Sequence, residues 1–253
     1  MKKLLIAVLS LTCLSAFAYP KIELTEDNSI AFNQAFTSRY VSLKQSEAAN
    51  KCLSGKVDDI YIVMYSPGGS VNAGGRFIDF LHALPCDFHT INLFSASMSY
   101  ITAQSLGDRL ITPSGVLMSH RASIRGIGGE IGGELDAILK MIKDNIQEID
   151  TRVAKRVGVS VEAYQKLISD ELWLTADKAV KTNHADKIVY AVCSKELSGT
   201  YEQVVNTFFG SYLVEFSNCP LITGPLSVTS SRGDVNRLLD YYNNIEDYVT
   251  TEL

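Results

Sequence analysis

Two residues of this chain, Ser97 and His120, have the chemical types and local settings that serine hydrolysis needs. Ser97 lies among small neighbours directly after an apolar run, and His120 ends a second apolar run. A serine hydroxyl becomes a useful nucleophile when an adjacent base takes its proton, and imidazole is the most common base. The alternatives are an N-cap serine and a histidine that makes structural hydrogen bonds alone. We interpret Ser97 as the candidate nucleophile and His120 as the candidate general base.

A glycine turn upstream offers a place for the negative charge that forms when a serine attacks a carbonyl carbon. The apolar run 60–65 predicts a buried strand, and the sequence Ser-Pro-Gly-Gly-Ser follows it at 66–70. Backbone N–H groups in such turns are free to bind an anion. We therefore predict an oxyanion hole made by the N–H groups of Gly69 and Met98, with an ordinary tight turn as the alternative.

Several segments together resemble the proteolytic subunit of the Clp protease, the ClpP family of serine peptidases. The resemblance spans residues 59–189. It rests on the turn at 66–71, Ala96-Ser97-Met98, Met118-Ser119-His120, and the segments 174–180 and 185–189. It implies a serine endopeptidase that cleaves peptides or unfolded proteins. The implied fold is α/β and ClpP/crotonase-like, with repeated β-β-α units around a largely parallel sheet and a projecting helix.

The resemblance also implies a third catalytic residue. The family places a carboxylate shortly before an aromatic residue and a Leu-Thr-Ala-like segment. Counting back from the segment 174–176 past Trp173 selects Glu171 as the acid that orients His120, where the family usually has aspartate. Asp170 is the adjacent alternative. In a third interpretation both acids are simply solvated.

Apolar periodicity predicts the elements that would position these residues. Strands are predicted at 29–36, 60–65, 90–94, 109–112 and 116–120, and helices at 42–53, 73–84, 97–106 and 134–157. Such alternation with short connections predicts an α/β fold around a largely parallel sheet. The helix at 134–157 has an apolar stripe, which is typical of a helix packed on its own sheet. The resemblance instead implies that this helix joins subunits into a homo-oligomer.

The N-terminal residues 1–18 have the pattern of an export signal. Two lysines precede an apolar stretch at 4–14, and Ala16-Phe17-Ala18 fits the rule for cleavage. Lipidation at Cys13 is the alternative. We therefore expect an exported protein, periplasmic or secreted. The rest divides into a ClpP-like domain at 19–189, in which residues 19–28 are predicted to be a loose leader, and a C-terminal extension at 190–253 of unassigned role, with a helix predicted at 234–248.

Four further cysteines permit disulfides, because their number is even and export leads to an oxidising compartment. We expect Cys193 to pair with Cys219, since both follow the segment that carries the resemblance. Cys52 and Cys86 are equally compatible with a disulfide and with buried thiols.

Composition and motifs exclude several function classes. The net charge of −5 argues against nucleic-acid binding. No later apolar run approaches a membrane span, so stable membrane insertion is not expected. The spacing of His, Cys, Asp and Glu predicts no metal site, and we expect no cofactor. The chain lacks a Walker-type loop, and a partner ATPase is not expected because an exported protein meets no ATP.

The same fold is compatible with other functions. A signal-peptide-peptidase-A-like protease would use a Ser–Lys dyad, and His120 in the position of the base argues against it. A non-catalytic binding or assembly protein could keep the same fold. An acyl-CoA enzyme of the crotonase type would need CoA, which an exported protein does not meet.

Overall fold

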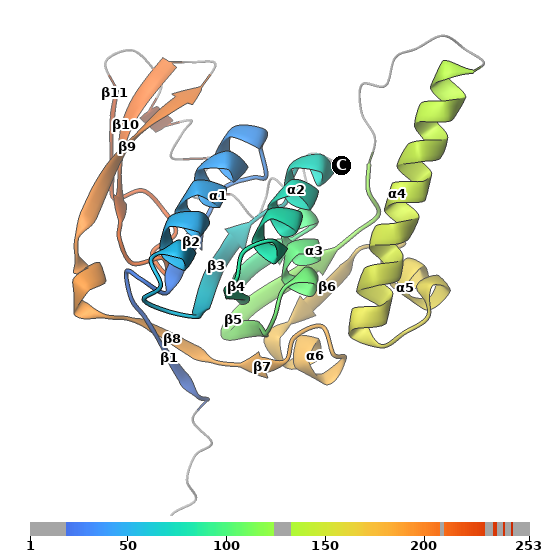
Figure 1. Cartoon of the computed structure of the whole chain (residues 1–253), viewed down its shortest axis with the longest axis horizontal. Helices are drawn as coiled ribbons and strands as arrows, with labels where there is room; N and C mark the ends of the chain where they lie inside the picture. The colour runs from blue at the N-terminus through green and yellow to red at the C-terminus, as the bar shows by residue number, and fades with distance from the viewer. Residues whose placement is uncertain are drawn as a thin grey trace, which may run out of the picture.

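A largely parallel sheet forms the centre of the computed structural model (Figure 1). The structure describes residues 19–123, 133–207 and 210–230, together with Val235, Asn236, Asp240 and Asn244. The sheet has six strands in the order β2-β3-β4-β5-β6, with β7 beside β5. The strands are β2 (Ser29–Phe32), β3 (Asp59–Ser66), β4 (Asp87–Ala96), β5 (Arg109–Ser119), β6 (Leu172–Thr175) and β7 (Lys187–Ile188). Only β6 pairs in the antiparallel direction within this sheet, which confirms the predicted fold class.

Helices follow the strands and cover the sheet. They are α1 (Ser38–Leu53), α2 (Val71–His82), α3 (Met98–Ser105), α4 (Glu134–Val157), α5 (Val161–Leu167) and α6 (Ala176–Lys181). Alternate side chains of β3 divide between two apolar clusters: Ile60 and Ile62 pack with Phe77 of α2, whereas Val63 packs with Leu24 and Val189. Both faces of the sheet are therefore buried, which explains why its strands read as continuous apolar runs.

The prediction of a loose leader at the start of the ClpP-like domain is wrong for part of that segment. Strand β1 (Lys21–Leu24) pairs in parallel with β8 (Tyr190–Cys193), and Leu24 is fully buried. The local sequence could not reveal this strand, because its partner and its core contacts come from the far end of the domain.

The two short strands predicted at 109–112 and 116–120 form one strand, β5. It continues through Pro113, which lacks a backbone N–H group. The ladder between β4 and β5 shifts register between Asn92 and Phe94. This irregularity lets the strand accommodate the proline that suggested a break.

Beyond β8 the chain forms a small antiparallel sheet in the order β11-β10-β9. Its strands are β9 (Thr200–Thr207), β10 (Gly210–Ser217) and β11 (Ser227–Ser230), preceded by the 3-10 helix η1 (Lys195–Ser198). None of these strands was predicted, and the helix predicted at 234–248 lies almost entirely outside the described residues.

Two disulfides connect segments that are distant in the sequence. Cys193 and Cys219 are bonded, as predicted, and connect β8 with the segment after β10. Cys52 and Cys86, for which the sequence left two possibilities, are also bonded. This second bond fastens the end of α1 to the segment just before β4.

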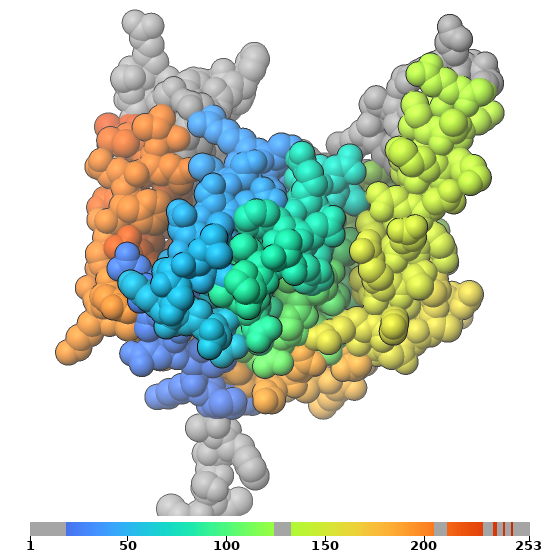
Figure 2. Space-filling view, in the orientation of Figure 1, coloured from blue at the N-terminus to red at the C-terminus, as the bar shows by residue number. Residues whose placement is uncertain are grey.

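Helix α4 has the predicted bounds and ends at Gly158, whose left-handed φ of 82° suits glycine. Its last two turns pack on the core through Val153, Ala154 and Val157. Its first half stands apart from the body in Figures 1 and 2, and Met141 is 63% exposed. Long as this helix is, neither it nor any other helix of the described chain is apolar enough to cross a membrane. Packing on the subunit's own core, one of the two predictions for this helix, therefore holds for its last two turns.

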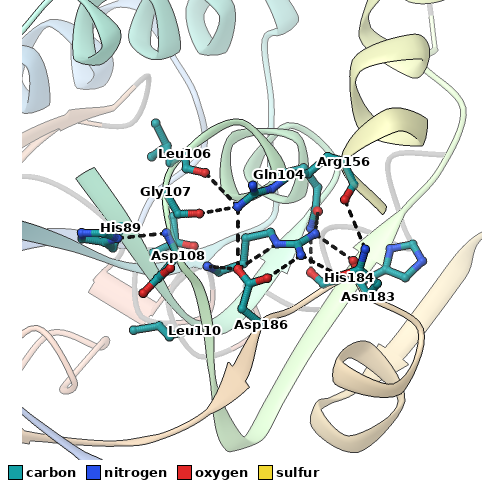
Figure 3. A network of polar contacts seen from close by, with 12 residues as sticks. His89, Gln104, Leu106, Gly107, Asp108, Leu110, Arg156, Asn183, His184 and Asp186 are labelled. Atoms are coloured by element: carbon teal, nitrogen blue, oxygen red, sulfur yellow. Dashed lines mark hydrogen bonds and ion pairs between the residues drawn. The ribbon is translucent and has the colours of Figure 1, made fainter. Parts of the chain in front are cut away.

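A buried guanidinium joins the start of β5 to the loop before β7. The Arg109 side chain is 2% exposed and contacts Asp186 at 2.6 Å and the Oε1 atom of Gln104 at 2.8 Å. Figure 3 shows these partners together with Asn183, whose carbonyl oxygen accepts a bond of 2.8 Å from Arg109 Nη1. Because the charge is paired and fully hydrogen-bonded, its burial is tolerated and the edge of the sheet is held in place.

Candidate active site

Ser97 occupies a sharp turn between β4 and α3. Its backbone has φ 55° and ψ −120°, and its side chain makes no capping hydrogen bond to the helix. A positive φ is uncommon for a residue with a side chain, and such strain gathers at functional turns of the strand-to-helix type. The Ser97 N–H group donates to the carbonyl oxygen of Met118 at 2.9 Å, which ties the turn to β5. The hydroxyl is therefore not used as a helix cap.

His120 directly follows β5, the neighbour of β4. The parallel register pairs Ala96 with Met118, so Ser97 and His120 leave adjacent strands at the same edge of the sheet. Both residues line one cavity of about 90 Å³. No hydrogen bond joins the Ser97 hydroxyl to the His120 ring in the described chain, and such bonds often tighten only when substrate binds.

The His120 imidazole is half-buried, and this setting changes its acidity. Burial lowers the pKa of the His120 ring below its ordinary value, and the Glu171 carboxylate opposes that shift. A ring with a lowered pKa is neutral at physiological pH. His120 is therefore in the protonation state that a general base requires.

Two glycines allow the turn at 66–70 to pack closely against Ser97 and Phe36. A Cβ atom at Gly68 would lie 2.6 Å from the Cβ atom of Ser97, and one at Gly69 would lie 2.8 Å from the backbone nitrogen of Phe36. Their φ angles of 96° and 133° are also unfavourable for other residues. Both positions therefore require glycine, Gly68 because of its contact with Ser97 and Gly69 because of its contact with Phe36.

The two predicted oxyanion donors come from the glycine turn and from the start of α3. Gly69 lines the same cavity as Ser97, and Met98 is the first residue of α3. Among the described residues, neither the Gly69 N–H nor the Met98 N–H has a protein acceptor. Both groups are thus available to a bound oxygen atom.

Glu171 is near enough to His120 for its carboxylate to raise the pKa of the ring, but no hydrogen bond or ion pair within 4.0 Å joins the two side chains in the described chain. Strand β6 pairs with β5 in the antiparallel direction as far as Leu172 opposite Ser119. Glu171 and His120 are the next residues beyond this pair, and Glu171 leaves the strand direction at a φ of 63°. The Oε2 atom of Glu171 accepts a hydrogen bond of 3.0 Å from Trp173 Nε1. Asp170, the alternative acid, is exposed and makes no described contact with His120.

The opposite wall of the cavity comes from residues that the sequence analysis missed. Helix α4 contributes Ile146, Ile149 and Asp150, and α5 contributes Tyr164, whose hydroxyl lies 2.8 Å from Ser119 Oγ. Asp150 continues the i+4 series that runs through the apolar stripe of α4. An acidic residue at a position where the stripe otherwise has apolar residues was the sequence signal that could have identified Asp150 as a candidate site residue.

Nothing in the described chain suggests a metal-dependent or a lysine-dependent centre. No group of three or more His, Cys, Asp or Glu side chains among the described residues has the geometry of a metal site. The described residues that line the Ser97 cavity include no lysine. His120 is therefore the nitrogen base among these residues.

Comparison with known proteins places most of the chain in one protein family. The chain is 30% identical over 134 residues to the ATP-dependent Clp protease proteolytic subunit 2 of Nocardia farcinica, covering 52% of this chain and 65% of that protein. It is 31% identical over 134 residues to the corresponding subunit of Porphyromonas gingivalis, covering 52% and 60%. The chain thus spans less than two thirds of the length of these curated relatives. The Clp protease family model matches residues 27–191, and the chain therefore belongs to the Clp protease family.

Proposed function

We propose that this chain is an exported serine endopeptidase in which Ser97, His120 and Glu171 form the catalytic triad. The observation that carries the proposal is the shared cavity: a strained, uncapped serine and a neutral histidine open onto the same space. Gly69 lines that space too and is well placed to bind the oxyanion. Family membership supports the reaction class.

The reaction follows from the roles of these groups. His120 takes the proton of the Ser97 hydroxyl as the oxygen attacks the peptide carbonyl carbon. The N–H groups of Gly69 and Met98 stabilise the resulting oxyanion. The protonated imidazole then gives its proton to the leaving amine as the C–N bond breaks. Water, deprotonated by His120, releases the acyl group and restores the serine.

Glu171 acts through the imidazole rather than on the substrate. A carboxylate beside the ring favours the tautomer that can accept the serine proton and stabilises the imidazolium that forms. Its raising effect on the pKa of His120 supports this arrangement. The hydrogen bond from Trp173 holds the carboxylate in place.

The proposed location is outside the cytoplasm, in the periplasm or the medium. The N-terminal pattern of an export signal supports this, and so do the two disulfides, since such bonds persist in oxidising compartments. The curated relatives are named ATP-dependent. For an exported chain we propose ATP-independent cleavage of peptides and loosely folded segments.

The proposed assembly is a homo-oligomer joined through the first half of α4. The half-exposed apolar side chains Ile138, Leu139 and Ile142 lie on this part of the helix and belong to none of the apolar clusters found among the described residues. Burial of such a stripe against a second copy would remove apolar surface from water. Family membership supports the same arrangement.

Labelling with a fluorophosphonate, followed by mass spectrometry of the adduct, tests the proposal. We expect modification of Ser97 and none in Ser97→Ala. Ser99→Ala is the matched control, because Ser99 is buried two residues away and its hydroxyl has no partner in the described chain. Its removal leaves no new unsatisfied group and should preserve labelling. Modification of another serine, or none in folded protein, would contradict the proposal.

A further inference from the structure

A buried carboxylate closes one side of the Ser97 cavity. Asp150 is 8% exposed and lines this cavity together with Ser97 and His120. The same cavity is lined by three isoleucines, Ile101 from α3 and Ile146 and Ile149 from α4, and by Tyr164 from α5. Carboxylates are seldom buried among aliphatic side chains without a cation to neutralise them.

The contacts of Asp150 leave its charge incompletely compensated. Its Oδ2 atom accepts one hydrogen bond of 3.0 Å, from the neutral amide of Gln165. Arg121 is near enough to favour the charged form, but no ion pair within 4.0 Å reaches Asp150 in the described chain. Burial raises the pKa of the Asp150 carboxyl, while Gln165 and Arg121 act to lower it. A carboxylate has room for several donors, so this one can accept more.

The position of the cavity decides which part of a substrate would meet this carboxylate. Because the nucleophile itself lines the cavity, the entering side chain belongs to the residue that supplies the scissile carbonyl group. This residue is called P1. A lysine or arginine there can lay its methylene stem along the isoleucines and present its cation to the acid.

We propose that Asp150 selects substrates with lysine or arginine at P1. This inference rests on the proposed function, since it assigns the substrate class of the same site. The buried acid makes the cavity complementary to a long cation. A leucine at P1 would match the aliphatic side chains but would leave the carboxylate without an ion pair, and a glutamate would be repelled by it.

Two peptides that differ only at P1 test the inference. With wild-type protein we expect kcat/KM for the lysine peptide to exceed that for the leucine peptide by at least about tenfold. Asp150→Asn keeps the shape and removes the charge, and we expect the lysine-to-leucine ratio to fall by about 10²-fold. The matched control is Glu148→Gln, which removes the same charge from an exposed position of α4 and should keep the ratio. A leucine preference in wild-type protein, or an unchanged ratio in Asp150→Asn, would overturn the inference.

A second measurement on wild-type protein covers the case in which the variant does not fold. We expect n-butylammonium to slow fluorophosphonate labelling of Ser97 more than n-butanol of similar size, because only the cation pairs with Asp150. Equal protection by both would overturn the inference while leaving the proposed nucleophile intact. If no peptide is cleaved and Ser97 is never labelled in folded protein, the proposed function fails and this inference fails with it.

Discussion

The two walls of the Ser97 cavity are built in different ways. On one side, backbone hydrogen bonds between parallel strands place Ser97 and His120. The turn that contains Gly69 packs closely there because positions 68 and 69 have no room for a side chain. On the other side, Ile149 and Asp150 belong to α4, a helix that packs on the core only through its last turns. The reacting groups thus depend on the geometry of the sheet. The helical wall can change its side chains without disturbing that geometry, which suits a determinant of specificity.

The largest effect is expected on the sheet side, where the reacting groups act as one unit. Ser97→Ala and His120→Ala should each lower kcat by about 10⁵-fold or more, with the fold retained, and the double variant should be no worse than either single one. Peptide hydrolysis measured for the three variants and for wild-type protein checks this. Independent, multiplying losses would contradict a shared mechanism. Activity that survives in His120→Ala would favour a different base.

The second-largest effect is expected from Glu171, the carboxylate that acts on the His120 ring. Glu171→Gln should lower kcat by about 10³-fold or more, whereas Asp170→Asn should remain close to wild type. The pH profile of kcat/KM gives a second readout. Activity needs the neutral ring and burial lowers its pKa, so the acidic limb of wild-type protein should lie below 6.5, the ordinary value for imidazole.

The same profile shows whether Glu171 acts through His120. Its carboxylate raises the pKa of the ring, so the acidic limb of Glu171→Gln should move to still lower pH, while that of Asp170→Asn should not move. A larger loss in Asp170→Asn would reverse the assignment. Small losses in both variants would mean a Ser–His dyad.

A smaller effect is expected from the turn that supports the nucleophile. Gly68→Ala places a methyl group 2.6 Å from the Cβ atom of Ser97 at a φ of 96°. We expect a loss of about 10²-fold in kcat from the displaced serine and a destabilisation of about 1–3 kcal/mol. Kinetics and thermal unfolding measure both.

Gly75→Ala is the control for that change. A Cβ atom at Gly75 meets nothing within 4 Å, and the residue lies inside α2. Alanine there should keep full activity and stabilise the helix by about 0.5–1 kcal/mol. Equal behaviour of the two glycine variants would show that close packing at Gly68 does not position Ser97.

The contrast between the two walls also explains what the sequence could predict. Ser97 and His120 stand at the ends of apolar runs, so their positions follow from local patterns and from parallel pairing. Strand β1 and Asp150 could not be placed in the same way. The first depends on a partner strand from residues 190–193, and the second shares a cavity with Ser97 only because α4 folds back against α3. Local periodicity contains neither of these long-range contacts.

The smallest effect on the folded subunit is expected from the exposed half of α4. Ile138→Lys together with Ile142→Lys should dissociate the proposed homo-oligomer, because two charges cannot be buried in an apolar contact without partners. Both side chains are only partly buried in the subunit, unlike Val153 and Val157. The free energy of unfolding should therefore change by about 0.5 kcal/mol or less.

Sedimentation and thermal unfolding of this variant separate the two halves of the helix. Ala137→Lys with Thr151→Lys adds the same charge at exposed positions of α4 and should leave the particle intact. If unmodified protein sediments as a monomer at micromolar concentration, the assembly proposal is wrong. If the isoleucine variant unfolds rather than dissociates, the first half of α4 supports the subunit itself. In that case the helical wall, with Asp150 in it, would be as fixed as the sheet that carries Ser97.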